Sequence, residues 1–259
     1  MLWIGLFALV VAVGCAYLAR AAHLRARAME STEAVSAAEL RALRTAAVEA
    51  GSAGYFRYRC ELTGQAAPHK NGALRSELEG LECVWHRHRI TRKYEETYRD
   101  GKGNRRRRTR TETMSEHSSP TAFFVQDATG RTVVRPGGAE VVGAEKVLDR
   151  FDPHQGGGGG RLRIGPVSLD LGRREGTIGF QREEWIVRPG SRFYVHGEAA
   201  DADGRLAVTA PAEGGVFVMS VKSEAELLRG ENTRVAGFGV AAGLAAVGGC
   251  VALVLALVG

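Results

Sequence analysis

The pattern of apolar and polar positions divides the chain into two uncharged ends and a long polar middle. Residues 2–19 and 235–258 are uncharged runs of 18 and 24 residues. An apolar run of about 20 residues can span the hydrocarbon core of a bilayer as a helix. The helix is required because lipid offers backbone N–H and C=O groups no hydrogen-bond partners. We therefore expect one transmembrane helix at each end of the chain.

The first run has a second interpretation, as a signal peptide or as a lipoprotein leader cleaved before Cys15. Both kinds of leader carry a basic segment ahead of the apolar core, and no basic side chain precedes Leu2. We therefore favour an uncleaved membrane anchor.

Basic residues gather on the inner flanks of the two runs. Arg20, Arg25 and Arg27 follow the first run, and Arg229 and Arg234 precede the second. The positive-inside rule then places the middle region in the cytoplasm and both termini outside. Because 30 of the 35 basic residues are arginine, the sequence suits a GC-rich prokaryote, and we expect a two-pass protein of its plasma membrane.

The middle region reads as many short strands. Between residues 54 and 222, runs such as YFRYRCEL, CVWHRHRI, AFFVQD and RFYVHGEA are dense in β-branched and aromatic residues and are separated by Gly, Pro, Asp and Asn. Such runs are typical of strands joined by turns. Residues 127–130 and 188–191 are expected hairpin turns, and the glycine-rich segment 152–160 is an expected flexible loop.

Two further segments favour helices. Residues 31–50 are rich in helix formers, with Ser31 or Thr32 available as a cap. Residues 223–234 begin with a capping box, Ser223 followed by Glu226. The predicted fold class is α+β, mostly β: a single β-rich domain beside the membrane, flanked by two transmembrane helices.

The stretch ECVWHRHRI contains metal-ligand side chains, but their spacing argues against a metal site. Residues alternate faces along a strand, so Cys83 and the pair His86 and His88 point to opposite sides. A structural zinc site usually draws its four ligands from Cys-x2-Cys or His-x3–5-His pairs, and neither spacing occurs in the chain. We expect no metal and no cofactor.

An arginine run, Arg105 to Arg108 with Arg110, allows two interpretations. It could bind an anionic ligand. Alternatively it forms the second strand of a hairpin, with residues 100–104 as the turn and with Glu95 and Glu96 opposite the arginines, where cross-strand ion pairs form. We favour the charged hairpin. The net charge of +6 suits weak attraction to anionic headgroups but does not indicate nucleic-acid binding.

No catalytic motif is visible in the sequence. There is no nucleophile elbow, no phosphate-binding loop and no His-Glu-x-x-His. Cys83 lies among apolar strand neighbours, where a thiol is usually inert packing, so it is only a speculative catalytic residue. Gly239 and Gly243 form a Gly-x-x-x-Gly pair in the second run, which suits close packing against the first helix or against a second copy of the chain.

Five motifs occur in order between the two apolar runs. They are ELTG at 61–64, LECVWHRHRI at 81–90, PTAFFVQDATGRTVVRPGGAEV at 120–141, EEWIVRPGSRFYVHGEA at 183–199 and VFVMSVKSEAELLRG at 216–230. On these motifs the chain resembles the GIDE-type mitochondrial E3 ubiquitin ligase family over about residues 32–258. The resemblance implies a two-span anchor and a β-rich beside-a-membrane domain.

In eukaryotic members of this family a C-terminal RING finger recruits a ubiquitin-conjugating enzyme. The present sequence ends one residue after its second apolar run, and we expect a RING-less relative. The favoured function is therefore a non-catalytic, membrane-anchored interaction or sensing module with a protein partner. The alternatives are ubiquitin-like transfer, with Cys83 or Cys60 as acceptor or with a RING supplied in trans, and anionic-ligand binding through the arginine hairpin.

Overall fold

The computed structural model describes residues 2–30, 32–154, 161–164, 167–170, 176–202 and 204–258. These residues form two compact units. One joins Met1–Glu33 to Lys222–Gly259, and the other is Ala34–Val221. The protein is mostly β, with a long apolar helix at each end, which confirms the predicted fold class.

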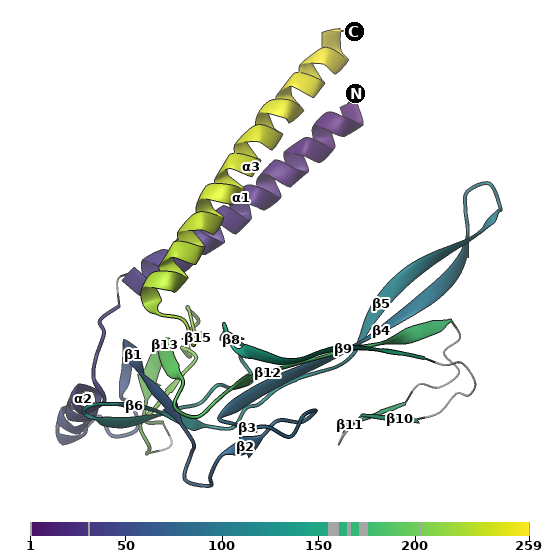
Figure 1. Cartoon of the computed structure of the whole chain (residues 1–259). Coiled ribbons are helices and arrows are strands. Elements are labelled where there is room, and N and C mark those ends of the chain that lie inside the picture. The colour runs from purple at the N-terminus through teal and green to yellow at the C-terminus, as the bar shows by residue number, and fades with distance from the viewer. Residues whose placement is uncertain are drawn as a thin grey trace. The chain divides into compact units, whose positions relative to one another are not determined.

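The first unit is a pair of antiparallel helices. Helices α1 (Leu2–Glu30) and α3 (Glu224–Val258) pack along each other with both termini at the same end (Figure 1). Segments Leu6–Leu24 and Glu224–Val251 are long and apolar enough to cross a bilayer, which is consistent with a two-pass membrane protein.

The start of α3 is the predicted capping box. The Ser223 N–H donates to the Glu226 carboxylate at 2.8 Å, and the Glu226 N–H donates to Ser223 Oγ at 3.3 Å. From there α3 runs into the apolar segment without a break, so the short helix and the span predicted as separate elements are one helix.

The second unit contains a closed five-stranded barrel. Its strands are β1 (Arg57–Ala67), β6 (Phe123–Asp127), β7 (Gly130–Val134), β14 (Ala207–Thr209) and β13 (Arg192–Ala200). They pair in that order, and β13 pairs back with β1 to close the ring. An odd number of strands cannot alternate in direction all the way around a ring. One pair must be parallel, and it is β7 with β14.

This connectivity, with the third and fifth barrel strands paired in parallel, is that of the OB-fold. The short strands β8 (Val141–Val142) and β15 (Val218–Ser220) extend the barrel sheet beyond β13. The interior is filled by alternate side chains of the strands, and its core residues include Cys60, Leu62, Trp85, Phe123, Val134, Phe193, Val195, Val208 and Met219. Fold alone does not assign a function.

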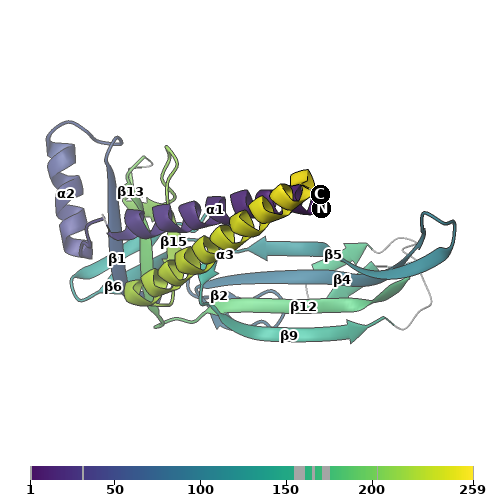
Figure 2. The same ribbon diagram turned by 90° about the horizontal axis from the view of Figure 1, so that it is seen from above.

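Two insertions between barrel strands build a second sheet. The connection from β1 to β6 contributes β4 (Trp85–Arg99) and β5 (Arg105–Ser118), and the connection from β7 to β13 contributes β9 (Glu145–Pro153) and β12 (Thr177–Val187). They form an antiparallel sheet in the order β5-β4-β12-β9 that runs away from the barrel (Figure 2). Pairing of β4 with β12 is therefore what joins the two insertions.

Two small hairpins complete the strands. They are β2 (Leu74–Arg75) with β3 (Glu82–Cys83), and β10 (Arg161–Ile164) with β11 (Val167–Asp170). Of the segment predicted as a flexible loop, Asp152 and Pro153 belong to β9, while residues 155–160 lie outside the described residues.

Helix α2 (Ala37–Glu49) begins later than the sequence predicted. Its cap is Ser36, which forms a capping box with Glu39. The N–H of Ala37 donates to the Asp127 carboxylate at 2.7 Å, which fixes the start of the helix on the β6–β7 turn. Thr32 lies outside the helix because this contact and the local Ser36–Glu39 capping box set the boundary, and Ser31 lies outside the described residues.

The two expected hairpin turns have different outcomes. Asp127 and Gly130 pair across the turn between β6 and β7, as predicted. Residues 188–191 do form a turn, but it links β12 to β13, which belong to different sheets and do not pair. The predicted hairpin of β4 and β5 is present, with its turn at residues 100–104.

Gly64 is required where β1 changes neighbours. Here β1 pairs with β13 on one side and begins to pair with β6 on the other. A Cβ added at Gly64 would lie 2.3 Å from the backbone oxygen of Gln126. Only glycine permits this approach of the two strands.

We expect Gly64→Ala to lower the stability of the barrel, because neither strand can move without opening the ring. The expected loss is about 1–3 kcal/mol, the usual cost of overpacking. Thermal unfolding of the full-length protein in detergent, followed by circular dichroism, measures it. Gly101→Ala, in the open β4–β5 turn and without a positive φ, introduces the same methyl group where no atom lies within 4 Å; an equal loss in both variants would contradict the steric account.

Candidate functional site

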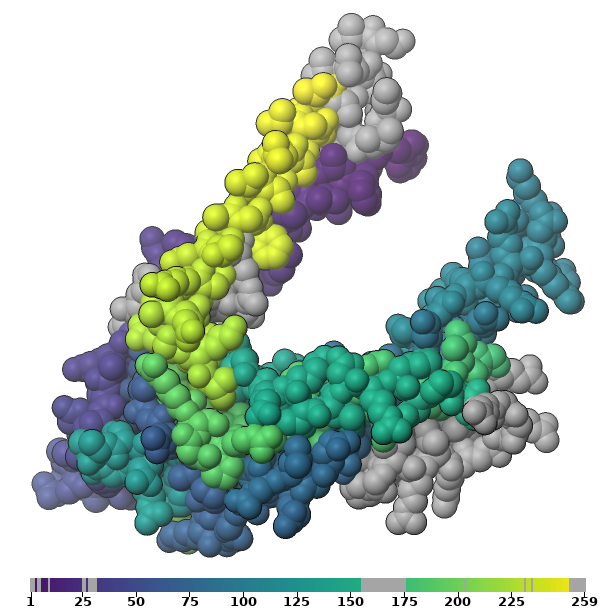
Figure 3. All heavy atoms as spheres, viewed as in Figure 1, coloured from purple at the N-terminus to yellow at the C-terminus, as the bar shows by residue number. Residues whose placement is uncertain are grey.

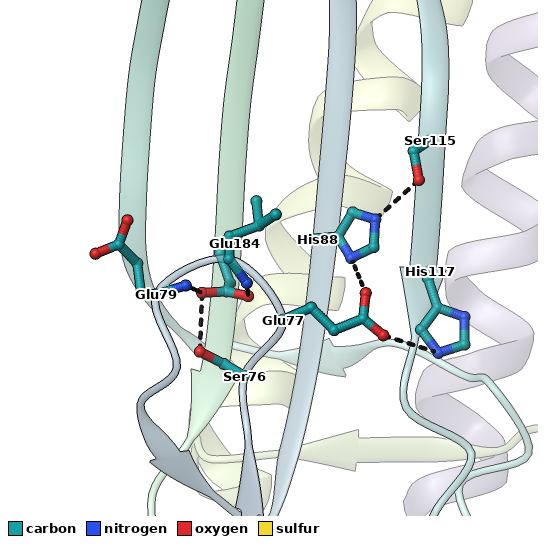
Figure 4. Close-up of polar contacts among 8 residues, drawn as sticks. Ser76, Glu77, Glu79, His88, Ser115, His117 and Glu184 are labelled. Atoms are coloured by element: carbon teal, nitrogen blue, oxygen red, sulfur yellow. Dashed lines mark hydrogen bonds and ion pairs between the residues drawn. The ribbon is translucent and has the colours of Figure 1, made fainter. Parts of the chain in front are cut away.

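A buried polar cluster lies where the loop of residues 76–81, between β2 and β3, covers one face of the second sheet (Figure 4). Three neighbouring strands and the loop supply its side chains. They are Ser76 and Glu77 from the loop, His86 and His88 from β4, Ser115 and His117 from β5, and Glu184 from β12.

Glu184 holds the loop in place. Its side chain is fully buried, and its carboxylate accepts hydrogen bonds from Ser76 Oγ at 2.9 Å, the Leu78 N–H at 2.7 Å and the Glu79 N–H at 2.9 Å. Ser76 Oγ in turn accepts from the Leu81 N–H at 3.1 Å. A buried carboxylate is tolerated only when its oxygens are satisfied, so the sheet and the loop fix each other.

The loop brings Glu77 to His88. His88 Nδ1 lies 2.7 Å from Glu77 Oε2, and His88 Nε2 lies 2.9 Å from Ser115 Oγ. The His88 side chain is 2% exposed, whereas Glu77 and Ser115 are half-buried. Nε2 of this buried imidazole is therefore hydrogen-bonded to a hydroxyl, whereas Nδ1 lies beside a carboxylate at ion-pair distance without the alignment of a hydrogen bond.

The electrostatics favour a neutral imidazole. Burial lowers the pKa of His88, and the opposing effect of the nearby Glu77 is smaller. A neutral ring carries one N–H, and the Glu77 carboxylate can only accept, so the proton belongs on Nδ1. Nε2 then accepts the hydrogen bond that Ser115 Oγ–H donates.

Two further histidines surround this network. The His117 ring lies 6.2 Å from His88 and 6.3 Å from His86, and His117 Nε2 is 3.7 Å from Glu77 Oε1. Burial lowers the pKa of His86 as well. Among the described residues, no three His, Cys, Asp or Glu side chains are placed to hold a metal ion.

A β-bulge decides which β5 side chains join the cluster. The register of β4 and β5 shifts between Ile90 and Thr91, so that Met114 is the extra residue in β5. A one-residue shift moves every later side chain to the opposite face of a sheet. Because of this bulge, Ser115 and His117 share a face with His88.

Burial disfavours a nucleophilic role for the two cysteines of the second unit, Cys60 and Cys83. Cys60 and Cys83 are both fully buried, and burial raises the pKa of each thiol to about 12. Thiols with such pKa values are protonated at neutral pH and shielded from solvent, which disfavours Cys83 as an acceptor.

The arginine run lies on β5, as a member of the predicted charged hairpin. The predicted cross-strand pairs are present: Arg107 with Glu95 at 3.7 Å, and Arg108 and Arg110 with Glu96 at 2.8 and 2.9 Å. The arginines alternate between the two faces of the hairpin, because Arg106 and Arg108 lie opposite Tyr98 and Glu96 while their neighbours point the other way.

A groove of about 570 Å³ lies along this hairpin. Its lining combines cations with carboxylates: Arg92, Tyr94, Glu95, Glu96, Thr97, Arg107 and Gly176. The carboxylates make it a poor site for a small free anion.

The two glycines of the second span lie on an open side of α3. A Cβ added at Gly239 or Gly243 would meet no atom within 4 Å among the described residues. Close packing through this pair, against α1 or against a second copy of the chain, therefore stays a prediction.

These features define a class: a closed barrel with an attached antiparallel sheet, between two candidate membrane helices. The family model GIDE, described as E3 ubiquitin ligase, matches residues 93–255. Since this is more than half of the chain, the protein belongs to the GIDE family. Searches of curated proteins and of solved structures each find no match.

We expect Glu184→Gln to loosen the loop, because an amide would direct a donor at N–H groups that need an acceptor. Leaving buried donors unpaired should lower the unfolding free energy by about 2–3 kcal/mol. Glu183→Gln, which removes a partly exposed ion pair with Lys146 on the other face, should cost under about 1 kcal/mol. Denaturant unfolding of both variants measures the difference, and equal losses would contradict the account.

Stability should also fall in mild acid. The unfolded chain takes up protons at its histidines below about pH 6.5, whereas burial keeps the pKa of His86 and His88 lower in the folded state. Folding stability from these groups is therefore complete above pH 6.5 and is lost as the pH falls toward the folded pKa values. Melting temperatures between pH 7.5 and 5 should decline, and His86→Gln with His88→Gln should flatten the decline; an unchanged slope would contradict this assignment.

Proposed function

We propose that the protein is a membrane-anchored interaction module of the GIDE family, which binds a protein partner through its hairpin arm. The arm comprises residues 95–109, the outer part of β4 and β5. The observation that carries the proposal is that this arm extends past the rest of the sheet, so that beyond Glu95 neither of its strands pairs with a third strand among the described residues.

The arm is structurally isolated. Strand β12 accompanies β4 as far as Tyr94, and Gly176, just before β12, accepts from the Glu95 N–H at 2.8 Å; beyond Glu95, β4 and β5 pair only with each other in the part of the chain that the structure describes. The arm projects from the end of the second unit (Figure 3). A two-stranded ribbon is marginally stable in water by itself, and its ion pairs, such as Arg106 with Asp100 at 3.0 Å, help to maintain it. Binding a partner would stabilise it further.

The charge of the arm indicates the chemistry of that partner. Six basic and three acidic side chains between residues 95 and 109 leave the arm at +3, out of a net +6 for the chain. The glutamates neutralise only part of the arginine charge. Such a surface suits an acidic protein surface, because complementary charge raises the rate and specificity of association.

The second unit would lie in the cytoplasm of a prokaryote, by the arginine distribution around the spans. Ubiquitin-like transfer, in accordance with the family description, is the alternative function, with a RING supplied by another protein. A second alternative is anionic lipid, which would engage the same arm. Self-association would use Gly239 and Gly243.

Crosslinking in native membranes, followed by purification and mass spectrometry, tests the arm. We expect Arg106→Ala with Arg107→Ala to remove the main crosslinked protein, and about 300 mM salt to weaken its binding through screening. Arg192→Ala with Arg205→Ala, exposed arginines outside the arm, should leave it unchanged.

An acidic protein partner lost only in the arm variant supports the proposal. Equal recovery with both pairs of substitutions would overturn it. Recovery of a ubiquitin-conjugating enzyme or a ubiquitin-like protein would favour the transfer alternative.

A further inference from the structure

We propose that Ser115, His88 and Glu77 form an acyl-transfer site that acts on carboxylic esters or thioesters. This site is separate from the hairpin arm, and it goes beyond the interaction function. Its basis is the order of contacts: a serine hydroxyl on Nε2 of a buried histidine and a carboxylate on Nδ1 of the same ring.

This arrangement, with a hydroxyl at Nε2 and a carboxylate at Nδ1, is the one that a histidine acting as a general base requires. A neutral histidine with its proton on Nδ1 leaves Nε2 free to take the proton of the serine hydroxyl. Nε2 is hydrogen-bonded to Ser115 Oγ at 2.9 Å, and Glu77 Oε2 lies 2.7 Å from Nδ1, where a rotation of the carboxylate would align it with the Nδ1–H. Burial of His88 supports the neutral form.

The supporting residues keep the geometry fixed. Glu77 stays against His88 because its neighbours in the loop, Ser76 and Leu78, are bound to the Glu184 carboxylate. Glu184 is thus a positioning residue that acts through the loop. The bulge at Met114 turns Ser115 toward His88, and bulges commonly occur beside active sites, where they redirect a side chain.

The strand edge beside Ser115 offers a backbone donor. The Ser119 N–H donates to the carbonyl of His86, so alternate residues 117 and 115 also direct their N–H groups toward β4. The N–H of Glu116 therefore points away from β4. Since β5 is the outermost strand of this sheet, no strand among the described residues pairs with it on that side to receive the N–H. An N–H of the residue after the nucleophile is a common oxyanion donor.

The chemical steps follow from these positions. Ser115 Oγ attacks the carbonyl carbon and forms a C–O bond, while its proton moves to His88 Nε2. The tetrahedral oxyanion faces the Glu116 N–H. The bond to the leaving alcohol or thiol then breaks, and the leaving group takes the proton from His88. Water, with His88 again as base, releases the carboxylic acid and restores Ser115.

A fluorophosphonate probe tests the nucleophile in the full-length protein in detergent. The expected result is a covalent adduct on Ser115, identified by peptide mass spectrometry, with loss of fluoride. Ser115→Ala should abolish it, whereas Ser118→Ala, a half-buried serine on the other face of the same strand, should retain it. His88→Gln should slow labelling at least about a hundredfold, and His69→Gln, at a histidine outside the cluster, should not.

A pH profile keeps the test independent of folding defects in the His88 variant. The titratable side chains that face His88 are Glu77, Glu184, His86 and His117. In the native protein the labelling rate should rise with pH and level off by about pH 7. Hydrolysis of p-nitrophenyl acetate and of an acetyl thioester, each compared with Ser115→Ala, identifies the acyl donor. Native protein that leaves Ser115 unlabelled, or labels it no faster than heat-denatured protein, would overturn the proposal.

Discussion

The buried carboxylate of Glu184 is the interaction on which the polar cluster depends. A fully buried charge beside a sheet is costly unless every oxygen is satisfied, and here the loop of residues 76–81 supplies three donors. The loop cannot leave the sheet without exposing unpaired groups on both sides. Its fixed position places Glu77 on His88, and His88 in turn reaches Ser115 on the outermost strand.

The same sheet joins the two insertions between the barrel strands of the second unit. An OB-type barrel is a small structure, and its two long insertions would be unsupported if each were alone. Pairing of β4 with β12 along ten positions turns them into one sheet, to which β5 and β9 add at the edges. Where β12 ends, that support ends, and the charged arm continues as a two-stranded ribbon. The cluster and the arm therefore lie along one continuous pairing of β4 with β5, in a sheet separate from that of the barrel.

Local sequence signals predicted the elements that local interactions decide. The apolar runs, the Ser223 capping box, the β4–β5 hairpin and its ion pairs to Glu95 and Glu96 all follow from propensity, period and charge. Barrel closure and the pairing of distant insertions depend on contacts between residues far apart in sequence, which no local pattern reveals. The cluster was missed for a specific reason. If the β4–β5 register is counted from the turn at residues 100–104 without a bulge, residue 116 lies opposite His88. The bulge at Met114 shifts the register by one residue, so that His117 lies opposite His88 and Ser115 lies on the same face of the sheet as His88.

The proton position on His88 tests the central claim most directly. The measurement is a two-bond ¹H–¹⁵N spectrum of the full-length protein labelled at histidine, in detergent at neutral pH. The His88 signal is assigned as the one that disappears in His88→Gln. We expect it to have the nitrogen shifts of a neutral ring protonated on Nδ1. Its Nε2 shift should change in Ser115→Ala, because the hydroxyl that donates to it is gone. A ring protonated on Nε2, or a doubly protonated imidazolium, would contradict the arrangement of Glu77, His88 and Ser115.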